Sequence, residues 1–412
     1  MEQYFFIPGR YPALTLAEII SAFKEEGLLY DLLLFSKEAA VFSVNGLSDI
    51  KTFSGKLGGV VKSGRVLDEI LFSDNEDKFN YIFTAAFLKE KGVLLNSGKI
   101  KFALSLYQAG ADAEIFSRLE KKLTELHVHL KDNLKSENIK AGFIRIKNRQ
   151  TQSVSLVKNS VLKSGFELSL VASAHSLFVG RTEWVQDFEG FARRDFYKPA
   201  KDKRSGIMPV KLARMMLNLS GKGESSAVAD PFAGSGTIIL EAAIMGFSKI
   251  YGSDISSKAV GDIRTNLNWL TGKQANVNLF VSDVARLSQK LQAQSIDAFV
   301  TEPYLGPPLH KFPTPEGINR LFRDLTPLYR AAFTNFRKLL KKDGRVVIIF
   351  PAFILSGRLK LFELGPIADD FEPVHLLREL KIAHADITVR GSFLYRSINQ
   401  FLIREIALFA RK

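Results

Sequence analysis

Three acidic residues stand at corresponding places in the second half of the chain. Asp230, Asp254 and Asp283 each come at the end of a short apolar run with the composition of a β-strand. A carboxylate in that place can accept hydrogen bonds from ribose hydroxyls, from the amino group of an adenine or from an ammonium group. One such acid alone is usually a solvated strand end. Three at successive strand ends predict a pocket shaped for a nucleoside.

The segment from Asp230 to Thr237 reads as a glycine-rich turn between a strand and a helix. Gly234 and Gly236 let the backbone come close to a ligand, because they carry no Cβ. No Gly-Lys-Ser/Thr follows, as a phosphate-binding loop requires, and no third glycine follows at the spacing of a dinucleotide motif. The turn therefore predicts a ligand site of another kind, unless it is an ordinary strand–helix turn.

A fourth apolar run, 298–301, leads into Glu302, Pro303 and Tyr304. This proline-stiffened loop would place a carboxylate and an aromatic ring at the mouth of the same pocket. An exocyclic amine is a weak nucleophile until its lone pair is freed from the ring, so an acceptor for its N–H and a stacking ring suit that task. The alternative is a proline-rich surface loop with an incidental glutamate.

The elements around these residues alternate between strands and helices. Strands are expected at 227–231, 249–253, 279–282, 298–301 and 345–350, and helices at 238–245, 257–270 and 316–340. A turn is expected at Asp343-Gly344, and two late strands at 374–382 and 400–409. Such alternation predicts an α/β fold with a doubly wound, largely parallel sheet. Ligands of such sheets bind beyond the carboxyl ends of the strands.

The first half of the chain has a different pattern of short strands and helices. Strands are expected at 4–8, 28–35, 39–44 and 166–179, and a helix at 15–26. We expect one small α+β unit there and a second one from about 60 to 165. A polar, basic connection follows from 180 to 209.

The 412 residues carry a net charge of +14 with a pI near 9.6, which favours an anionic partner such as nucleic acid or an acidic membrane surface. Two windows, 131–163 and 190–214, hold 8 basic and 2 acidic residues each. Cysteine is absent, which excludes disulfides and thiolate chemistry, and the six scattered histidines imply no metal site. No signal pattern opens the chain, and the longest apolar stretch (346–355) is shorter than a membrane span of about 20 residues. A cytoplasmic protein is expected.

Together, Asp230–Thr237, Asp254, Asp283 and Glu302–Gly306 resemble the motifs of class I S-adenosylmethionine-dependent methyltransferases that act on amino nitrogens. The segments 193–202 and 204–213 resemble the linker and first motif of the tRNA guanosine-10 N2-methyltransferase family, and the opening 4–19 resembles its start. The likeness implies a ferredoxin-like domain (1–60), a THUMP RNA-binding domain (61–170), a linker (171–215) and a Rossmann-like methyltransferase domain (216–412). It also implies tRNA as substrate, with a small activating protein as a further partner.

The resemblance assigns roles to individual residues. The implied S-adenosylmethionine-binding residues are Ser205, Met208, Pro209, Asp230, Phe232, Gly234, Gly236, Thr237, Asp254, Ile255, Asp283 and Val284. The implied catalytic residues are Glu302, Pro303 and Tyr304. The basic run of the linker, which includes Arg193, Arg194, Lys198, Lys201 and Arg204, predicts RNA-binding residues that contact phosphates, unless it is a solvated basic face.

One motif departs from the family. The family has Asp-Pro-Pro-Tyr followed by Gly, whereas this chain has Glu302-Pro303-Tyr304-Leu305 before Gly306. Alignment on Tyr304 would instead place Thr301 at the position of the acid, but alignment on Gly306 keeps an acid and the loop length. Two alternatives remain open: the same chemistry on ribosomal RNA or DNA, and a non-catalytic RNA-binding protein with a decayed methyltransferase domain.

Overall fold

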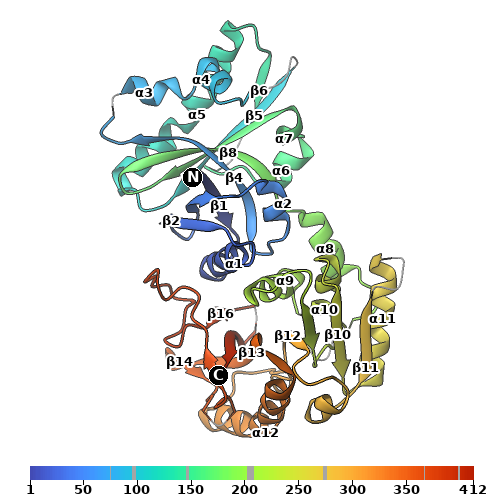
Figure 1. Cartoon of the computed structure of the whole chain (residues 1–412). Helices are drawn as coiled ribbons and strands as arrows, with labels where there is room; N and C mark the ends of the chain where they lie inside the picture. The colour runs from blue at the N-terminus through green and yellow to red at the C-terminus, as the bar shows by residue number, and fades with distance from the viewer. Residues whose placement is uncertain are drawn as a thin grey trace. The chain divides into compact units, whose positions relative to one another are not determined.

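The chain forms two compact units, which we define by their residues (Figure 1). The computed structural model describes residues 1–74, 76–94, 99–144, 148–201, 208–271, 276–365, 367–397 and 400–412. Unit 1 comprises 1–12, 27–56 and 60–187, and unit 2 comprises 13–26, 57–59 and 188–412. The division into two units does not test the four predicted domains, whose boundaries at 60, 170 and 215 stay predictions.

Unit 1 is built on one eight-stranded sheet with the order β2-β3-β1-β4-β8-β7-β5-β6. Its strands are β1 (Glu2–Pro8), β2 (Leu29–Phe35), β3 (Ala40–Asn45), β4 (Val60–Leu71), β5 (Ile100–Gln108), β6 (Ala141–Phe143), β7 (Gly165–Ala172) and β8 (Ser176–Val185). The first four strands are antiparallel to their neighbours, in the order of a ferredoxin-like β-α-β-β-α-β unit. Because β4 also pairs with β8, the sheet continues without a break past residue 60.

The helices of unit 1 are short except for α5. They are α2 (Ile50–Gly55), α3 (Glu76–Tyr81), α4 (Ala85–Glu90), α5 (Ala113–Ser136), α6 (Ser153–Lys158) and α7 (Val161–Ser164). The run 166–179 was expected as one strand, but it forms β7 and β8 with a turn between them. The Ser173 hydroxyl stabilises that turn by donating to the carbonyl oxygen of Ser176 (2.9 Å) and accepting from its N–H (2.9 Å), which an apolar pattern alone does not indicate.

Unit 2 holds the predicted doubly wound sheet, with the strand order β11-β10-β9-β12-β13-β17-β15. The strands are β9 (Ala227–Asp230), β10 (Lys249–Asp254), β11 (Val277–Val281), β12 (Ile296–Thr301), β13 (Leu340–Leu355), β14 (Arg358–Leu361), β15 (Phe371–Pro373), β16 (Phe393–Tyr395) and β17 (Ile403–Arg411). The first five strands of this order are parallel, and β17 is antiparallel to β13. The run β9 is buried along its whole length, as expected for a parallel strand covered on both faces.

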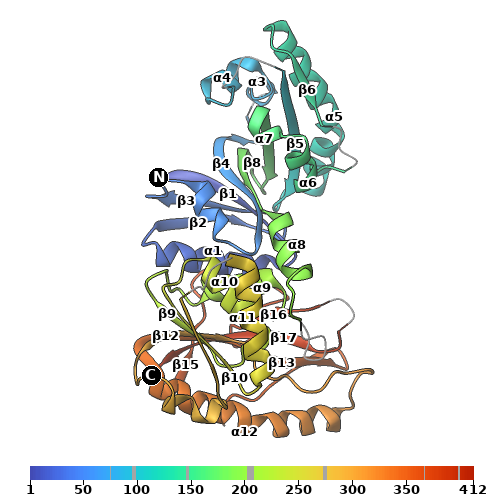
Figure 2. The same cartoon turned by 90° about the vertical axis from the view of Figure 1, so that its right-hand side faces the viewer.

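Helices cover both faces of this sheet (Figure 2). The helices of unit 2 are α1 (Pro12–Glu25), α8 (Phe188–Phe196), α9 (Val210–Leu219), α10 (Thr237–Ile244), α11 (Ser257–Thr271), the 3₁₀ helix η1 (Val284–Gln289) and α12 (Pro315–Leu339). Helix α12 lies on one face, and α9, α10 and α11 lie on the other. The buried residues of α12 recur at spacings of three and four: Phe322, Leu325, Tyr329, Phe333 and Phe336. They form one apolar face, so this long amphipathic helix packs along the sheet.

Two predictions near the end of the chain are wrong. The segment 374–382 is not a strand: β15 ends at Pro373, and the chain then turns, with Lys381 at a positive φ of 50°. Charged residues interrupt the apolar run there, so it has no continuous face to bury. The predicted turn at Asp343-Gly344 lies inside β13, where the pairing with β12 shifts register between Ile296 and Ala298.

Across the described part of the chain, no helix has both the length and the apolar character needed to cross a membrane.

Candidate active site

The glycine-rich turn connects β9 to α10, as predicted. Gly234 has a φ of +52° and Gly236 a φ of +87°, a region that favours glycine. A Cβ on Gly236 would lie 2.9 Å from Ile263 of α11, so this glycine is required by packing. A Cβ on Gly234 would meet no heavy atom within 4 Å. The turn therefore leaves open space at Gly234, where a ligand can approach the backbone.

Asp254 at the end of β10 lies beside this turn. Its Oδ2 accepts from the N–H of Gly234 (3.0 Å) and its Oδ1 from the N–H of Ser256 (2.9 Å). The next residue, Ile255, is 72% exposed. A large apolar side chain left in solvent next to a half-buried acid is suited to contact a nucleoside, because the acid can still accept from hydroxyls while the side chain covers a ring.

Asp283 and Val284 follow β11, the neighbour of β10. Asp283 is exposed and its Oδ1 accepts from the N–H of Ala285 (2.9 Å), which caps η1, whereas Val284 is buried. The N–H of Ser282 donates to the carbonyl oxygen of Asp254 (3.0 Å), so the ends of β10 and β11 are joined directly. The three predicted acids thus lie at one edge of three neighbouring parallel strands.

Asp230 differs from the other two acids because it is buried. Its Oδ1 accepts from the hydroxyl of Thr301 (2.6 Å) and from the N–H of Phe232 (3.1 Å). Burial raises the pKa of Asp230 to about 7, and the negative charges of Asp254 and Glu302 act in the same direction. A cationic ligand at this edge would favour its ionised form.

The loop after β12 carries the predicted catalytic residues. Glu302 accepts a hydrogen bond at Oε1 from Nε of Arg404 (2.5 Å), a residue of β17, and its side chain is 17% exposed. Pro303 is buried and Tyr304 is 55% exposed. The hydroxyl of Tyr329 on α12 donates to the carbonyl oxygen of Tyr304 (3.0 Å). The loop is therefore held from two sides, with the tyrosine ring left exposed.

The linker residues lie partly in the interior of unit 2, which corrects the prediction for Lys198. Lys198 is 3% exposed and its Nζ donates to the hydroxyl of Thr237 (2.7 Å) at the first turn of α10; burial lowers its pKa to about 8. Arg194 donates from Nε to the buried Glu241 (2.7 Å). An ammonium group that is enclosed in this way does not reach an RNA phosphate.

The other linker predictions fall into three groups. Arg193 is exposed and lies over the ring of Trp269 (5.2 Å to the centroid), and Lys201 donates to the carbonyl oxygen of Phe196. Met208 is buried, and Pro209 caps the N-terminus of α9. Arg204 and Ser205 lie outside the described residues.

Three residues that the sequence interpretation missed hold this site together. Arg404 pairs with Glu302, and Glu241 joins Arg194 to Arg214 (2.8 Å). Asn266 of α11 donates to the carbonyl oxygens of Ser235 and Ala200 (2.9 Å each). Glu241 is the one charged side chain of the otherwise apolar helix α10, which is the signal that would have found it. Asn266 has no such signal, because α11 carries many polar residues.

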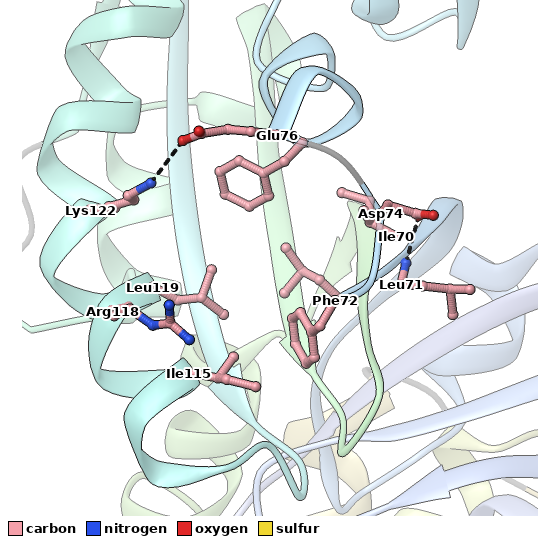
Figure 3. A pocket seen from close by; sticks show the side chains of 11 residues that line it. Ile70, Leu71, Phe72, Asp74, Glu76, Ile115, Arg118, Leu119 and Lys122 are labelled. Atoms are coloured by element: carbon pink, nitrogen blue, oxygen red, sulfur yellow. Dashed lines mark hydrogen bonds and ion pairs between the residues drawn. The ribbon is translucent and has the colours of Figure 1, made fainter.

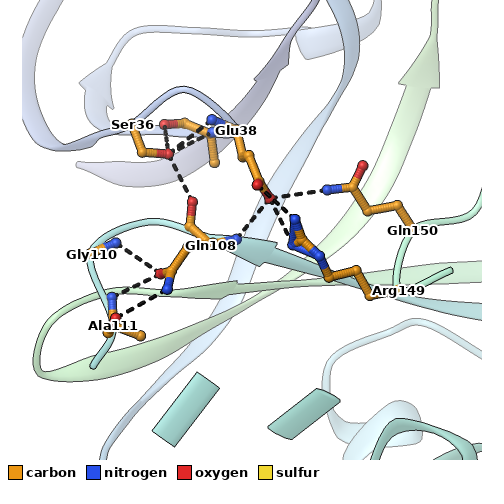
Figure 4. A network of polar contacts seen from close by, with 8 residues as sticks. Ser36, Glu38, Gln108, Gly110, Ala111, Arg149 and Gln150 are labelled. Atoms are coloured by element: carbon orange, nitrogen blue, oxygen red, sulfur yellow. Dashed lines mark hydrogen bonds and ion pairs between the residues drawn. The ribbon is translucent and has the colours of Figure 1, made fainter. Parts of the chain in front are cut away.

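Two cavities of unit 1 are lined by none of the residues of this site. One cavity of about 290 Å³ lies beside α5 and is lined mainly by apolar side chains, with an ion pair between Glu76 and Lys122 (3.3 Å) at its rim (Figure 3). Another, of about 560 Å³, is lined by polar residues around Lys62 and Arg149. Figure 4 shows Glu38 accepting from Arg149 (2.8 Å), Gln150 (3.1 Å) and the backbone of Gln108 (3.0 Å).

His127 of α5 takes part in packing. His127 is buried and its Nε2 accepts from the N–H of Leu104 (3.1 Å), and burial lowers its pKa, so the ring is neutral. Among the residues that the structure describes, no group of three or more His, Asp or Glu side chains could hold a metal ion.

Comparison with known proteins agrees with this geometry. Residues 197–355 match the family described as RMKL-like, methyltransferase domain. The crystal structure of TrmN from Thermus thermophilus is similar over all of both chains, with a TM-score of 0.53 at 14% identity, which shows the fold. The fold and the site therefore define a class I S-adenosylmethionine-dependent methyltransferase, as its motifs predicted.

The relatives found by sequence similarity have more specific names. The chain is 25% identical to the tRNA (guanine(10)-N2)-dimethyltransferase of Pyrococcus abyssi over 316 residues, which are 74% of this chain and 84% of that protein. It is 36% identical over 114 residues to the protein of the same name from Methanothermobacter thermautotrophicus, which are 28% and 30% of the two chains. The resemblance to the tRNA guanosine-10 N2-methyltransferase family is confirmed.

Proposed function

We propose that this protein transfers a methyl group from S-adenosylmethionine to the exocyclic N2 amine of a guanosine in tRNA. The observation that carries the proposal is the hydrogen bond between Thr301 and Asp230 (2.6 Å), because it joins the loop with Glu302 directly to the glycine-rich turn. The proposed acceptor for the guanine amine and the glycine-rich turn proposed to bind the cofactor therefore lie at the same edge of the sheet. The relatives whose names specify tRNA guanine-N2 supply the substrate class.

S-adenosylmethionine, when bound, supplies a methyl group on a positively charged sulfur. The residues at this edge fit such a ligand: the backbone at Gly234 is open, Asp254 would accept from ribose hydroxyls, and Ile255 would cover the purine. Asp283 would accept from the adenine amino group, and the buried Asp230 would face the cationic methionine part. Phe232, Gly236, Thr237, Met208, Pro209 and Val284 shape the turn and its surroundings.

Glu302 and the carbonyl oxygen of Pro303 accept hydrogen bonds from the amine and orient its lone pair. The exposed ring of Tyr304 stacks on the guanine. Catalysis comes mainly from positioning the amine for in-line attack, without a covalent enzyme intermediate. The guanosine has to leave its stack to reach this edge, so the RNA must be held nearby while it does.

RNA contacts are assigned to exposed basic residues. Lys131, Lys135, Lys158 and Lys163 are exposed on α5, α6 and α7 of unit 1, and Arg193 is exposed on α8. Exposed cations of this kind bind phosphates, and each released counterion makes binding weaker as salt rises. A small activating protein remains a prediction, and so does a cytoplasmic location.

The test is methyl transfer from labelled S-adenosylmethionine to unmodified tRNA, ribosomal RNA and duplex DNA, followed by nucleoside mass spectrometry. N2-methylguanosine or N2,N2-dimethylguanosine should form only with tRNA, and Glu302→Ala should abolish it. Methylated adenine in DNA would contradict tRNA as the substrate and show that DNA is methylated. Methylguanosine only in ribosomal RNA would show that ribosomal RNA is the substrate. Binding of the cofactor without product on any nucleic acid would favour a decayed enzyme.

A further inference from the structure

The guanidinium group of Arg404 joins the two loops that lie at the mouth of the site. Its Nε donates to Glu302 on the loop after β12 (2.5 Å), and its Nη1 donates to Ser397 and to Gln400 (3.2 Å each) on the segment before β17. The side chain of Arg404 is only 7% exposed. One buried cation thus contacts the proposed amine acceptor and the segment beside it.

The neighbouring residue on β17 provides a comparison within the same strand. Arg404 and Glu405 lie opposite Pro351 and Phe350 of β13, so their side chains leave the strand on opposite faces. Glu405 is fully buried and pairs with Arg390, whose Nε donates to it (2.6 Å). The strand therefore carries two buried ion pairs, and only one of them contacts the catalytic loop.

Stability alone does not explain the pair of Arg404 and Glu302. Removing two charges from water is costly, and replacing a buried pair by apolar side chains is often neutral or stabilising. A glutamate also has one more rotatable bond than the aspartate of the resembled family, so its carboxylate loses more freedom when it is held in one place. An ion pair that fixes it beforehand removes that cost from the reaction.

We propose that Arg404 is a positioning residue for methyl transfer: it holds the carboxylate of Glu302 in place to orient the amine. This role rests on the proposed function. Arg404 does not contact the base itself, because its nitrogens are directed to Glu302, Ser397 and Gln400. Its removal should lower the rate of transfer and leave cofactor binding unchanged.

The test compares Arg404→Ala with Arg390→Ala, which breaks the other buried pair of β17. We expect kcat for tRNA to fall about 100-fold in Arg404→Ala, the loss that a displacement of about 1 Å can cause, while the Kd for S-adenosylmethionine stays within about twofold of wild type. Guanidinium ion at millimolar concentration should restore part of the kcat of Arg404→Ala. Arg390→Ala should lower the melting temperature, keep kcat within about twofold of wild type, and show no rescue.

A second variant covers the case in which Arg404→Ala does not fold. Arg404→Lys keeps the charge but not the fork of donors, and should lower kcat about tenfold at nearly unchanged melting temperature. Wild-type kcat in either variant, or equal losses in Arg404→Ala and Arg390→Ala without rescue, would overturn the role of Arg404. A wild-type protein that methylates another acceptor would overturn the proposed substrate, and the same comparison would then be made on that acceptor. A wild type that methylates none would overturn both proposals.

Discussion

At Asp230, burial disfavours the ionised carboxylate, whereas a cationic ligand favours it. Its carboxyl has a pKa of about 7 instead of 3.8, mainly because of desolvation. A positively charged ligand binds the ionised form better, so the ligand must also supply the free energy of ionisation below pH 7. The affinity of the site for S-adenosylmethionine should therefore depend on pH.

We expect the Kd for S-adenosylmethionine to decrease as pH rises from 6 to 8. With a pKa near 7 only about a tenth of Asp230 is ionised at pH 6, so the change is up to about tenfold. Asp230→Asn should bind more weakly than wild type at pH 8 and show a much flatter pH dependence. Isothermal titration calorimetry at pH 6 and pH 8 measures the Kd for S-adenosylmethionine in both proteins. An equally steep dependence in the variant would assign the titration to another group.

Gly234 and Gly236 allow a matched test of the open space in the turn. Gly234→Ala meets no neighbouring atom and carries only the left-handed strain of about 1–2 kcal/mol, whereas Gly236→Ala also meets Ile263. Gly234→Ala should fold but raise the Kd for S-adenosylmethionine at least tenfold, because the added methyl group occupies the ligand's place. Gly236→Ala should mainly lower the melting temperature. Unchanged affinity in folded Gly234→Ala would contradict the cofactor site.

At the residue scale, the acids and glycines were predictable because each belongs to a short local motif. Asp230, Asp254 and the glycines have roles that follow from their place at a strand end or a turn. Arg404 and Asn266 were not predictable in this way, since their partners lie 102 and 66 residues away along the chain. Lys198 was assigned to RNA because it belongs to a basic run, and only the structure shows that it is buried.

At the scale of elements, α8, α9 and α10 are joined by the buried carboxylate of Glu241. It accepts from Arg194 (2.7 Å) and Arg214 (2.8 Å), and both guanidinium groups lie over the ring of Phe191 (4.7 and 4.9 Å to the centroid). Two adjacent arginines of α8 therefore have different environments. Arg194 contributes to the fold, and Arg193 is exposed to a partner.

This difference predicts opposite phenotypes for two neighbouring substitutions. Arg194→Met leaves Glu241 with one partner fewer and should destabilise unit 2 by about 3 kcal/mol, with little change in the salt dependence of tRNA binding. Arg193→Met should leave stability nearly unchanged and reduce the slope of log affinity against log salt by about 0.7–0.9. Thermal melting and binding at several salt concentrations measure both. A reduced slope with Arg194→Met alone would reverse the assignment.

Most elements of unit 2 were predictable, because buried parallel strands and the amphipathic α12 have strong periodic patterns. The exceptions are informative. In unit 2, the segment 374–382 has apolar residues but turns where charges interrupt them. In unit 1, the single apolar run 166–179 folds as two strands. Composition indicates how much of a run is buried, but a turn of three residues is decided by local hydrogen bonds such as those of Ser173.

At the scale of the whole molecule, the chain order and the compact units differ. Helix α1 and residues 57–59 precede most of unit 1 in sequence, yet they belong to unit 2. Glu18 of α1 accepts from the N–H groups of Gly58 (2.6 Å) and Gly59 (2.8 Å) and from Asn218 of α9 (2.7 Å). No local pattern in the sequence predicts this long-range arrangement.

Glu18 should make stability depend on pH. Burial raises its pKa from 4.5 to about 7, so between these values the folded protein binds more protons than the unfolded chain and stability falls as pH rises. In Glu18→Gln this contribution, up to about 3 kcal/mol between pH 4.5 and 8, should disappear. Denaturant unfolding of both proteins at pH 5.5 and 8 measures it. Equal pH dependence in the two proteins would show that Glu18 does not titrate in this range.

The central claim is that the methyl acceptor is the exocyclic amine of a guanosine. Inosine lacks only that amine, so the most direct measurement compares a tRNA with guanosine at the mapped site of modification and the same tRNA with inosine there. We predict full methyl transfer to the first and none to the second, with equal binding of both RNAs. Methyl transfer to the inosine-containing site at the same rate would contradict the account, because the methyl group would then be placed on another atom.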